Sequence, residues 1–252
     1  MGRLKELNPY ATLSCETSSA ELTTDELKGF TMVCASSTSM AKLGAVNDVC
    51  RGAGVPFLGI GSMGGAAFAF VDLLEHEYEE IKVSKEEDKD KRKRSGEKVY
   101  KEVETKERKT VKYVTLSSSI SASWSELPNR PHRLFFALKA RAEAQDEADA
   151  DKCCVVLSKV LGQLEQAGDN ANQGSRKRRR NKIPNGIDES YMRAVVEQEG
   201  TELCPVCSVM GGIVAQQVIR AMSRKNAPLC NWLLFDTVLG NAVSLNVGCQ
   251  TT

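Results

Sequence analysis

Apolar and polar positions follow two different periods in the first part of the chain, and each period predicts a different element. Residues 30–36 (FTMVCAS) form a compact apolar run, typical of a strand that is buried on both faces. Residues 39–52 repeat apolar side chains at helical spacing, and a second apolar run, VPFLGIG, follows at 55–61. Strand, helix and strand in this order predict that residues 1–74 contain a parallel, right-handed βαβ unit.

Residues 53–71 carry no charged side chain and are nearly long enough to cross a bilayer. They include five glycines and a proline, however, and few of the bulky aliphatic residues that favour insertion. We therefore expect buried strands joined by a glycine turn, and no membrane span. Gly59, Gly61 and Gly64 match the letters of a GxGxxG loop, but the following GAAFAFVDL is typical of a strand. The helix that would bind phosphate is missing, so no nucleotide site is predicted.

The chain changes character after residue 74. Residues 75–112 are largely charged, with both signs, and we expect a mobile insertion because they have little apolar surface to bury. A strand and a helical segment are expected within 113–170, followed by a basic polar loop at 171–188. The last part, 189–252, predicts a helix and then two strands around a turn at Gly240-Asn241.

Composition limits the class of protein and the cellular compartment that we expect. With 41% hydrophobic and 27% charged residues, the 252-residue chain has the composition of a soluble globular protein. Its formal net charge of +1 gives no overall attraction to nucleic acids or acidic membranes. The nine cysteines are an odd number and follow no signal segment, which favours the reducing cytosol or nucleus over secretion.

Cys204 and Cys207 form a CPVC motif for which three interpretations stay open: structural thiols, a redox pair, or half of a zinc site. A structural zinc site needs four ligands, and the chain has no second CxxC and only two isolated histidines, His76 and His132. Neither histidine is close in sequence to a cysteine that it could activate. The sequence therefore predicts no metal ligands and no catalytic residue.

The residues after the CPVC motif predict a helix, with Pro205 in its first turn. Gly211 and Gly212 would permit close approach of another backbone. A wide apolar stripe lies at helical spacing, formed by Val206, Val209, Met210, Ile213 and Val214. Taken alone, the pattern is that of a core helix without chemistry.

The polar loop contains five consecutive basic residues, Arg176, Lys177, Arg178, Arg179 and Arg180. We interpret them as a nuclear-import candidate, because such a signal needs an exposed basic cluster. Phosphate contacts and a solvated run of charge are the alternatives. No aromatic side chain is interleaved to stack on bases, so nucleic-acid binding is not expected.

Four stretches together resemble the small, Aos-type subunits of SUMO-activating enzymes, in the ThiF/MoeB-like activating-enzyme superfamily. They are LKELNPYATLSCET, the segment from FTMVCASS to LLEHEY, VKYVTL with SWSEL, and the C-terminal segment from ELCPVC to SLNVG. The last is the most specific, because it matches that family's helix and closing hairpin. The matching positions are Pro205, Val206, Gly211, Gly212, Ala215, Gln216, Phe235, Asp236, Gly240 and Asn241.

The resemblance implies an α/β fold: the C-terminal part of a Rossmann-like, ThiF-type adenylation domain with a closing β-hairpin and disordered charged insertions. That family carries a first Rossmann strand, a glycine-rich nucleotide loop and an arginine that reaches the partner, and these are not found ahead of LKELNP here. Active members also have an aspartate for magnesium-ATP where Thr38 stands, and a hydroxyl does not supply the charge of a carboxylate. The resemblance thus implies no catalytic residue and no cofactor on this chain.

What it implies is a non-catalytic subunit of a heterodimeric enzyme, in the nucleus and also the cytoplasm. ATP and magnesium would be bound by the large partner subunit, which would adenylate SUMO and form the thioester; SUMO would be met through the complex. Two alternatives stay open: the regulatory half of an activating enzyme for another ubiquitin-like modifier, and a truncated pseudo-subunit that acts only as an interaction protein. We expect poor solubility of the chain alone, because its sheet would have an open edge.

Overall fold

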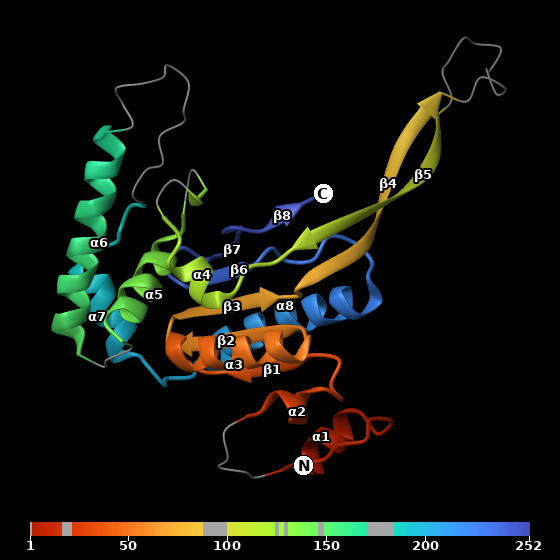
Figure 1. The fold of residues 1–252 in the computed structure, drawn as a ribbon, viewed down its shortest axis with the longest axis horizontal. Coiled ribbons are helices and arrows are strands. Elements are labelled where there is room, and N and C mark those ends of the chain that lie inside the picture. The colour runs from red at the N-terminus through yellow and green to blue at the C-terminus, as the bar shows by residue number, and fades with distance from the viewer. Residues whose placement is uncertain are drawn as a thin grey trace.

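The computed structural model describes residues 2–16, 22–87, 100–123, 126–128, 131–145, 149–170 and 184–252. Over these residues the protein is a mixed α/β structure with two sheets (Figure 1). The central sheet has the order β1 (Val33–Ser36), β2 (Phe57–Met63), β3 (Ala66–Asp72), β6 (Trp232–Asp236), β7 (Asn241–Leu245). The second sheet has the order β4 (Glu75–Glu87), β5 (Tyr100–Lys112), β8 (Gln250–Thr251).

The predicted βαβ unit is confirmed. β1 and β2 pair in parallel, with Val33 opposite Phe57, and helix α3 (Met40–Ala53) connects them. The Ser39 side chain caps α3 by accepting a hydrogen bond from the Lys42 N–H at 3.2 Å. Gly54 ends the helix in the left-handed conformation, with a φ of 70°, which glycine adopts without steric cost. Local sequence signals were therefore sufficient to predict where this helix begins and ends.

The segment that could have been taken for a membrane span is two strands joined by a glycine turn. β2 and β3 are antiparallel from Phe57 opposite Asp72 to Met63 opposite Ala66. Gly64 in the turn has a φ of 57°, and a Cβ added there would lie 2.0 Å from Gln198 Oε1. Because β6 pairs with its other edge, β3 is enclosed on both sides, and all seven of its residues are buried.

Two apolar clusters cover the two faces of the central sheet. Phe68 and Phe70 of β3 belong to the first cluster, where Phe70 packs on Trp232 with ring centroids 5.0 Å apart. Ala67 and Ala69 point to the second cluster, as alternation along a strand requires. Helices α3, α4 (Leu116–Ile120), α5 (Arg133–Glu143), α6 (Ala150–Asn170) and α7 (Glu189–Glu197) contribute to the first. Of the described helices, only α8 (Cys204–Ser223) contributes to the second.

Two short helices precede this core. α1 (Gly2–Leu7) buries none of its residues, whereas α2 (Thr24–Leu27) buries Leu27. Thr23 and Glu26 form a reciprocal capping box at the start of α2. The α2 turn thereby packs its one apolar side chain against the first cluster.

Within the predicted mobile insertion, residues 75–87 and 100–112 form two long paired strands. β4 and β5 pair from Glu75 opposite Lys112 to Glu87 opposite Tyr100, and the hairpin extends away from the rest of the protein (Figure 1). Opposite charges meet across it: Lys112 Nζ lies 3.2 Å from Oε1 of Glu75, directly opposite, and Lys82 Nζ lies 2.7 Å from Oε2 of Glu107, on the diagonal. Cross-strand pairs of this kind favour strand pairing without a buried apolar face.

Candidate functional site

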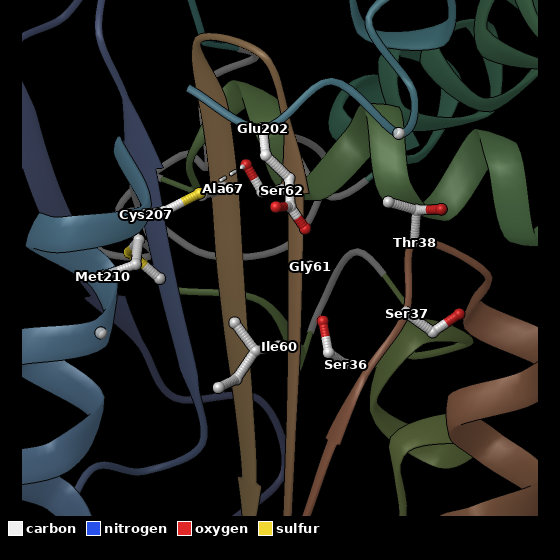
Figure 2. A pocket seen from close by; sticks show the side chains of 12 residues that line it. Ser36, Ser37, Thr38, Ile60, Gly61, Ser62, Ala67, Glu202, Cys207 and Met210 are labelled. Carbon is white, nitrogen blue, oxygen red and sulfur yellow. Dashed lines mark hydrogen bonds between the residues drawn. The ribbon is translucent and has the colours of Figure 1, made fainter. Parts of the chain in front are cut away.

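A cavity of about 440 Å³ lies at the carboxyl ends of β1 and β2, beside the start of α8 (Figure 2). This is the edge of an α/β sheet at which ligands usually bind. Ser36, Ser37 and Thr38 follow β1 into the cavity, and Ser62 projects from β2. Glu202 supplies the one charged side chain of the lining.

Thr38 is held by a half-buried ion pair, Glu199 with Arg141, rather than left free to bind a ligand. Its hydroxyl donates to Glu199 Oε1 at 2.6 Å, and the same oxygen accepts from Arg141 Nη2 at 2.7 Å. Burial alone would raise the pKa of Glu199, but the hydrogen bonds from Thr38 and Arg141, with the arginine's charge, lower it. Arg141 is fully buried, and its Nε has no hydrogen-bond partner among the described residues. The Glu199 carboxylate is therefore already paired with the positive charge of Arg141.

The residues of this cavity do not fit magnesium-ATP. No lysine or arginine is among the described residues that line it, so nothing there offsets the charge of a triphosphate. The position where active relatives in the resemblance carry an aspartate holds Thr38, whose proton is donated to Glu199. In the described part of the chain, no group of three or more His, Cys, Asp or Glu side chains could hold a metal ion.

The CPVC motif lies at the first turn of α8, with its two thiols in different surroundings. Cys204 is exposed, whereas Cys207 is half-buried in the cavity wall with its Sγ 3.9 Å from Ser62 Oγ (Figure 2). Both are free thiols. His76 lies on β4 and His132 caps α5, where its Nδ1 accepts from the Leu134 N–H at 3.2 Å. The structure thus brings neither histidine to the motif, and the cavity offers hydrogen-bonding groups without an activated nucleophile.

The expectation of a core helix is wrong for one side of α8. Val206, Met210 and Val214 pack on the sheet, whereas Val209, Ile219 and Met222 are 44%, 65% and 52% exposed. A helix that is apolar on every side is normally buried on every side. By length and composition alone, α8 is also the one described helix that could cross a bilayer.

We call the exposed apolar side the outer face of α8; it consists of Val209, Gly212, Gln216, Ile219 and Met222. A Cβ added to Gly211 or Gly212 would meet no atom within 4 Å, so the room for a close neighbour that the sequence predicted is open. Arg220 is the one charged residue in α8. The outer face of α8 is consequently apolar and accessible, and it is narrow in the middle because its glycine has no side chain.

Asp236, which the sequence singled out in the closing hairpin, is a buried structural group. It accepts hydrogen bonds from Arg133 and from the Tyr191 hydroxyl, the latter at 2.9 Å. Val238 N–H donates to its other oxygen at 2.9 Å, which shapes the turn between β6 and β7. Sequence reasoning missed Arg133 and Tyr191; the signal that could have found them is the lone charge next to the apolar run LFFALK.

The family-motif residues separate into two groups. Val206 and Asp236 are buried, whereas Pro205, Gly211, Gly212 and Gln216 lie exposed on α8. The import candidate, Arg176 to Arg180, lies outside the described residues. The structure therefore places the α8 residues beside the cavity, whereas Asp236 lies elsewhere and stabilises the fold.

Comparison with known proteins gives one consistent set of relatives. No family model matches the chain. SUMO-activating enzyme subunit 1A of Arabidopsis thaliana is 28% identical over 260 residues, covering 99% of this chain and 70% of the relative. Subunit 1B-1 of the same plant is 28% identical over 247 residues, covering 95% and 68%. The Homo sapiens SUMO-activating enzyme subunit 1 is 25% identical over 264 residues, covering 96% and 70%.

Proposed function

The chain is homologous over nearly its full length to subunit 1 of the SUMO-activating enzyme, and on this premise we propose that it is the non-catalytic subunit of a heterodimeric SUMO-activating enzyme. In this role it supports ATP-dependent adenylation of the SUMO C-terminus and thioester formation on the large partner subunit. The chain contacts SUMO through the complex, and it acts in the SUMO conjugation pathway. The βαβ unit and the hairpin of β6 and β7 would then belong to a ThiF-type adenylation domain.

The proposed docking of the partner rests on the outer face of α8. Three large apolar side chains, Val209, Ile219 and Met222, are exposed on one helix. We take exposed apolar side chains gathered on one helix as the mark of a protein contact. Gly212 and Gln216 lie between them, so a partner backbone can approach closely and still find a hydrogen-bonding group. Pro205 starts α8, Val206 seats it on the sheet, and Gly211 keeps its surface narrow, whereas Asp236 acts elsewhere by holding α5 and α7 to β6.

The cavity supports a role without catalysis on this chain. Active chemistry there would need a free carboxylate for magnesium and a cation for the phosphates. Glu202 is the one carboxylate among the described lining residues, but no lysine or arginine accompanies it there, and Glu199 is already paired with Arg141 and Thr38. We therefore assign ATP and magnesium to the partner subunit.

The first test is co-expression with the large subunit of the SUMO-activating enzyme, followed by co-purification and an assay of ATP-dependent SUMO thioester on that subunit. A stable complex that forms the thioester is expected. Binding without thioester would make the chain an interaction protein only, and thioester with a different ubiquitin-like modifier would assign it to another activating enzyme. No binding would overturn the proposed function.

A pair of matched variants locates the contact. Ile219→Glu places a charge on the outer face of α8, where the side chain is 65% exposed, and is expected to weaken binding of the large subunit at least about tenfold. Val155→Glu places the same charge on α6, where the side chain is 72% exposed, and should leave binding unchanged. Both sites are exposed, so neither variant should alter the melting temperature appreciably. Equal binding by the two variants would remove α8 from the interface.

We also propose that the basic run Arg176 to Arg180 directs the protein to the nucleus, with a fraction left in the cytoplasm. Replacing the five residues with glutamine in a fluorescent fusion should shift the protein to the cytoplasm. A fusion that stays nuclear after this change would assign import to another segment or to the partner.

A further inference from the structure

Two cysteines from different parts of the chain meet beside the base of the β4–β5 hairpin. Cys230 comes shortly before β6, and Cys249 comes directly before β8. Asn231 holds the two segments together, because its Nδ2 donates to the Val247 carbonyl at 3.0 Å and its Oδ1 accepts from the Val247 N–H at 3.1 Å. This reciprocal pair fixes the segment around Cys230 alongside the segment that leads to Cys249.

Both cysteines pack against the second apolar cluster, and a Cβ added to Gly248, the neighbour of Cys249, would lie 3.3 Å from the Val114 side chain, next to Tyr113. Cys230 Sγ also lies 4.0 Å from the Tyr113 Oη, and the Tyr113 hydroxyl is fixed by donating to the Leu229 carbonyl at 2.8 Å. Both cysteines are half-buried, so a small solute can reach them, and both are free. The pair is therefore pre-positioned, accessible and unbonded.

The surroundings shift the pKa values of the two thiols in opposite directions. The neighbouring Cys249 thiol lowers the pKa of Cys230 to about 7, with burial acting against it. The same proximity and burial raise the pKa of Cys249. Two further ionisable groups act on the pair at longer range, Tyr78 on Cys230 and Asp72 on Cys249. Near neutral pH the pair thus combines a partly ionised, nucleophilic sulfur with a protonated neighbour.

We propose that Cys230 and Cys249 are a redox-active pair that a hydroperoxide converts to a disulfide. The Cys230 thiolate attacks one peroxide oxygen, the O–O bond breaks, and a sulfenic acid forms while hydroxide leaves and takes up a proton. The Cys249 sulfur then attacks the sulfenic sulfur, the S–O bond breaks, and water leaves with the Cys249 proton. In total the two thiols lose two electrons and two protons, and hydrogen peroxide is reduced to two waters.

The disulfide would connect the two sheets near the chain end. β8 pairs with β5, where Thr252 N–H donates to the Thr110 carbonyl at 2.9 Å and Thr110 N–H donates to Thr252 at 3.0 Å. Linking Cys249 to Cys230 fastens β8, and with it the base of the hairpin, to the start of β6. In a reducing compartment such a bond is transient and reversible, which is the usual form of a cytosolic redox switch.

The sequence provides an internal control for the test. No lysine or arginine occurs after Lys225, so trypsin releases Cys230 and Cys249 together in the peptide 226–252. The peptide 194–220 likewise contains both cysteines of the CPVC motif. Hydrogen peroxide titration of the purified chain, followed by digestion without reductant and mass spectrometry, therefore compares the two pairs in one sample.

We expect peptide 226–252 to lose the mass of two hydrogens at roughly tenfold lower peroxide than peptide 194–220, since thiolate is the reactive form. In Cys249→Ser a sulfenic acid should accumulate on Cys230 and react with a dione trap. Equal oxidation of both peptides, or earlier oxidation of 194–220, would overturn the proposal. Hydrogen exchange of the Thr252 N–H, slower in the oxidised protein, would establish that the bond fastens β8; unchanged exchange would contradict that part.

A second measurement does not depend on oxidation. Alkylation of Cys230 by iodoacetamide should reach half its maximal rate near pH 7, whereas alkylation of Cys34, whose pKa is raised by burial, should require higher pH. Identical pH profiles for the two thiols would overturn the assignment of Cys230 as the nucleophile.

Discussion

Arg133 binds both carboxylate oxygens of Asp236, with Nε 2.7 Å from Oδ2 and Nη2 2.9 Å from Oδ1. The two side chains are 8% and 2% exposed. Tyr191 donates to the same carboxylate, and the Arg133 guanidinium lies 4.1 Å from the centroid of its ring. One charge pair thereby ties α5 and α7 to the end of β6.

Loss of this pair should be costly. Asp236→Asn leaves Arg133 as a buried charge without its counter-ion, so we expect the free energy of unfolding to fall by about 3–5 kcal/mol. Urea denaturation measures the change. Arg193→Gln, which removes an exposed ion pair with Asp151, should leave the free energy nearly unchanged. Equal costs for both variants would mean that burial adds nothing to the Arg133 pair.

The same carboxylate makes stability depend on pH. Burial would raise the pKa of Asp236, but the bonds from Arg133, Tyr191 and Val238 N–H, with the Arg133 charge, hold it below its usual value of 3.8. A carboxylate with a lowered folded-state pKa stabilises the fold fully above the unfolded value, and that part is lost as pH falls through the folded value. The urea midpoints of wild type and Asp236→Asn should therefore converge as pH falls below about 4. A constant difference down to low pH would contradict the linkage.

Restoring an acidic residue at position 38 should not restore ATP chemistry. Thr38→Asp would place a second carboxylate about where a hydroxyl now donates to Glu199 at 2.6 Å, so repulsion replaces a hydrogen bond. We expect a lower melting temperature and no ATP binding by calorimetry. Thr38→Asn, which keeps a donor without the charge, should be less destabilised. Tight, magnesium-dependent ATP binding by Thr38→Asp would refute our interpretation of the cavity.

Gly212→Ala should separate folding from docking. Alanine favours a helix interior over glycine by about 0.5–1 kcal/mol, and the added Cβ meets no atom of this chain, so the isolated protein should become more stable. Binding of the large subunit should weaken if its backbone approaches the outer face of α8 closely. Gly61→Ala provides the contrast, because its Cβ would lie 2.3 Å from the Phe68 ring and should destabilise the chain. A Gly212→Ala protein that binds as well as wild type would rule out close packing at that position.

Much of the central sheet could be predicted because its signals are local. The apolar runs of β1 and β2 and the capped helix between them each lie within a few residues, and so does the turn at Gly64. The β4–β5 hairpin could not be predicted in this way. Its support comes from which charges meet across the two strands, such as Lys82 and Glu107 on the diagonal, and composition does not contain that register.

The site was harder to predict than the fold, since its contacts join distant segments. Thr38 and Glu199 are 161 positions apart, and nothing near Thr38 indicates that a carboxylate will reach it. The apolar composition of α8 was recognised, but it predicts a buried helix, and only the structure reveals that Ile219 faces outward. Burial depends on what the rest of the chain covers, which periodicity alone does not determine.

The pairing of β3 with β6 has a consequence for the protein's synthesis. Trp232 stands opposite Phe70, and Asp236 stands opposite Ala66, so β3 leaves the ribosome long before its second neighbour exists. At about 5–20 residues per second, the delay is on the order of ten seconds. During that interval Phe68 and Phe70 lack the indole that later covers them. Until its last strands emerge, the nascent chain therefore exposes apolar surface of the kind that promotes aggregation.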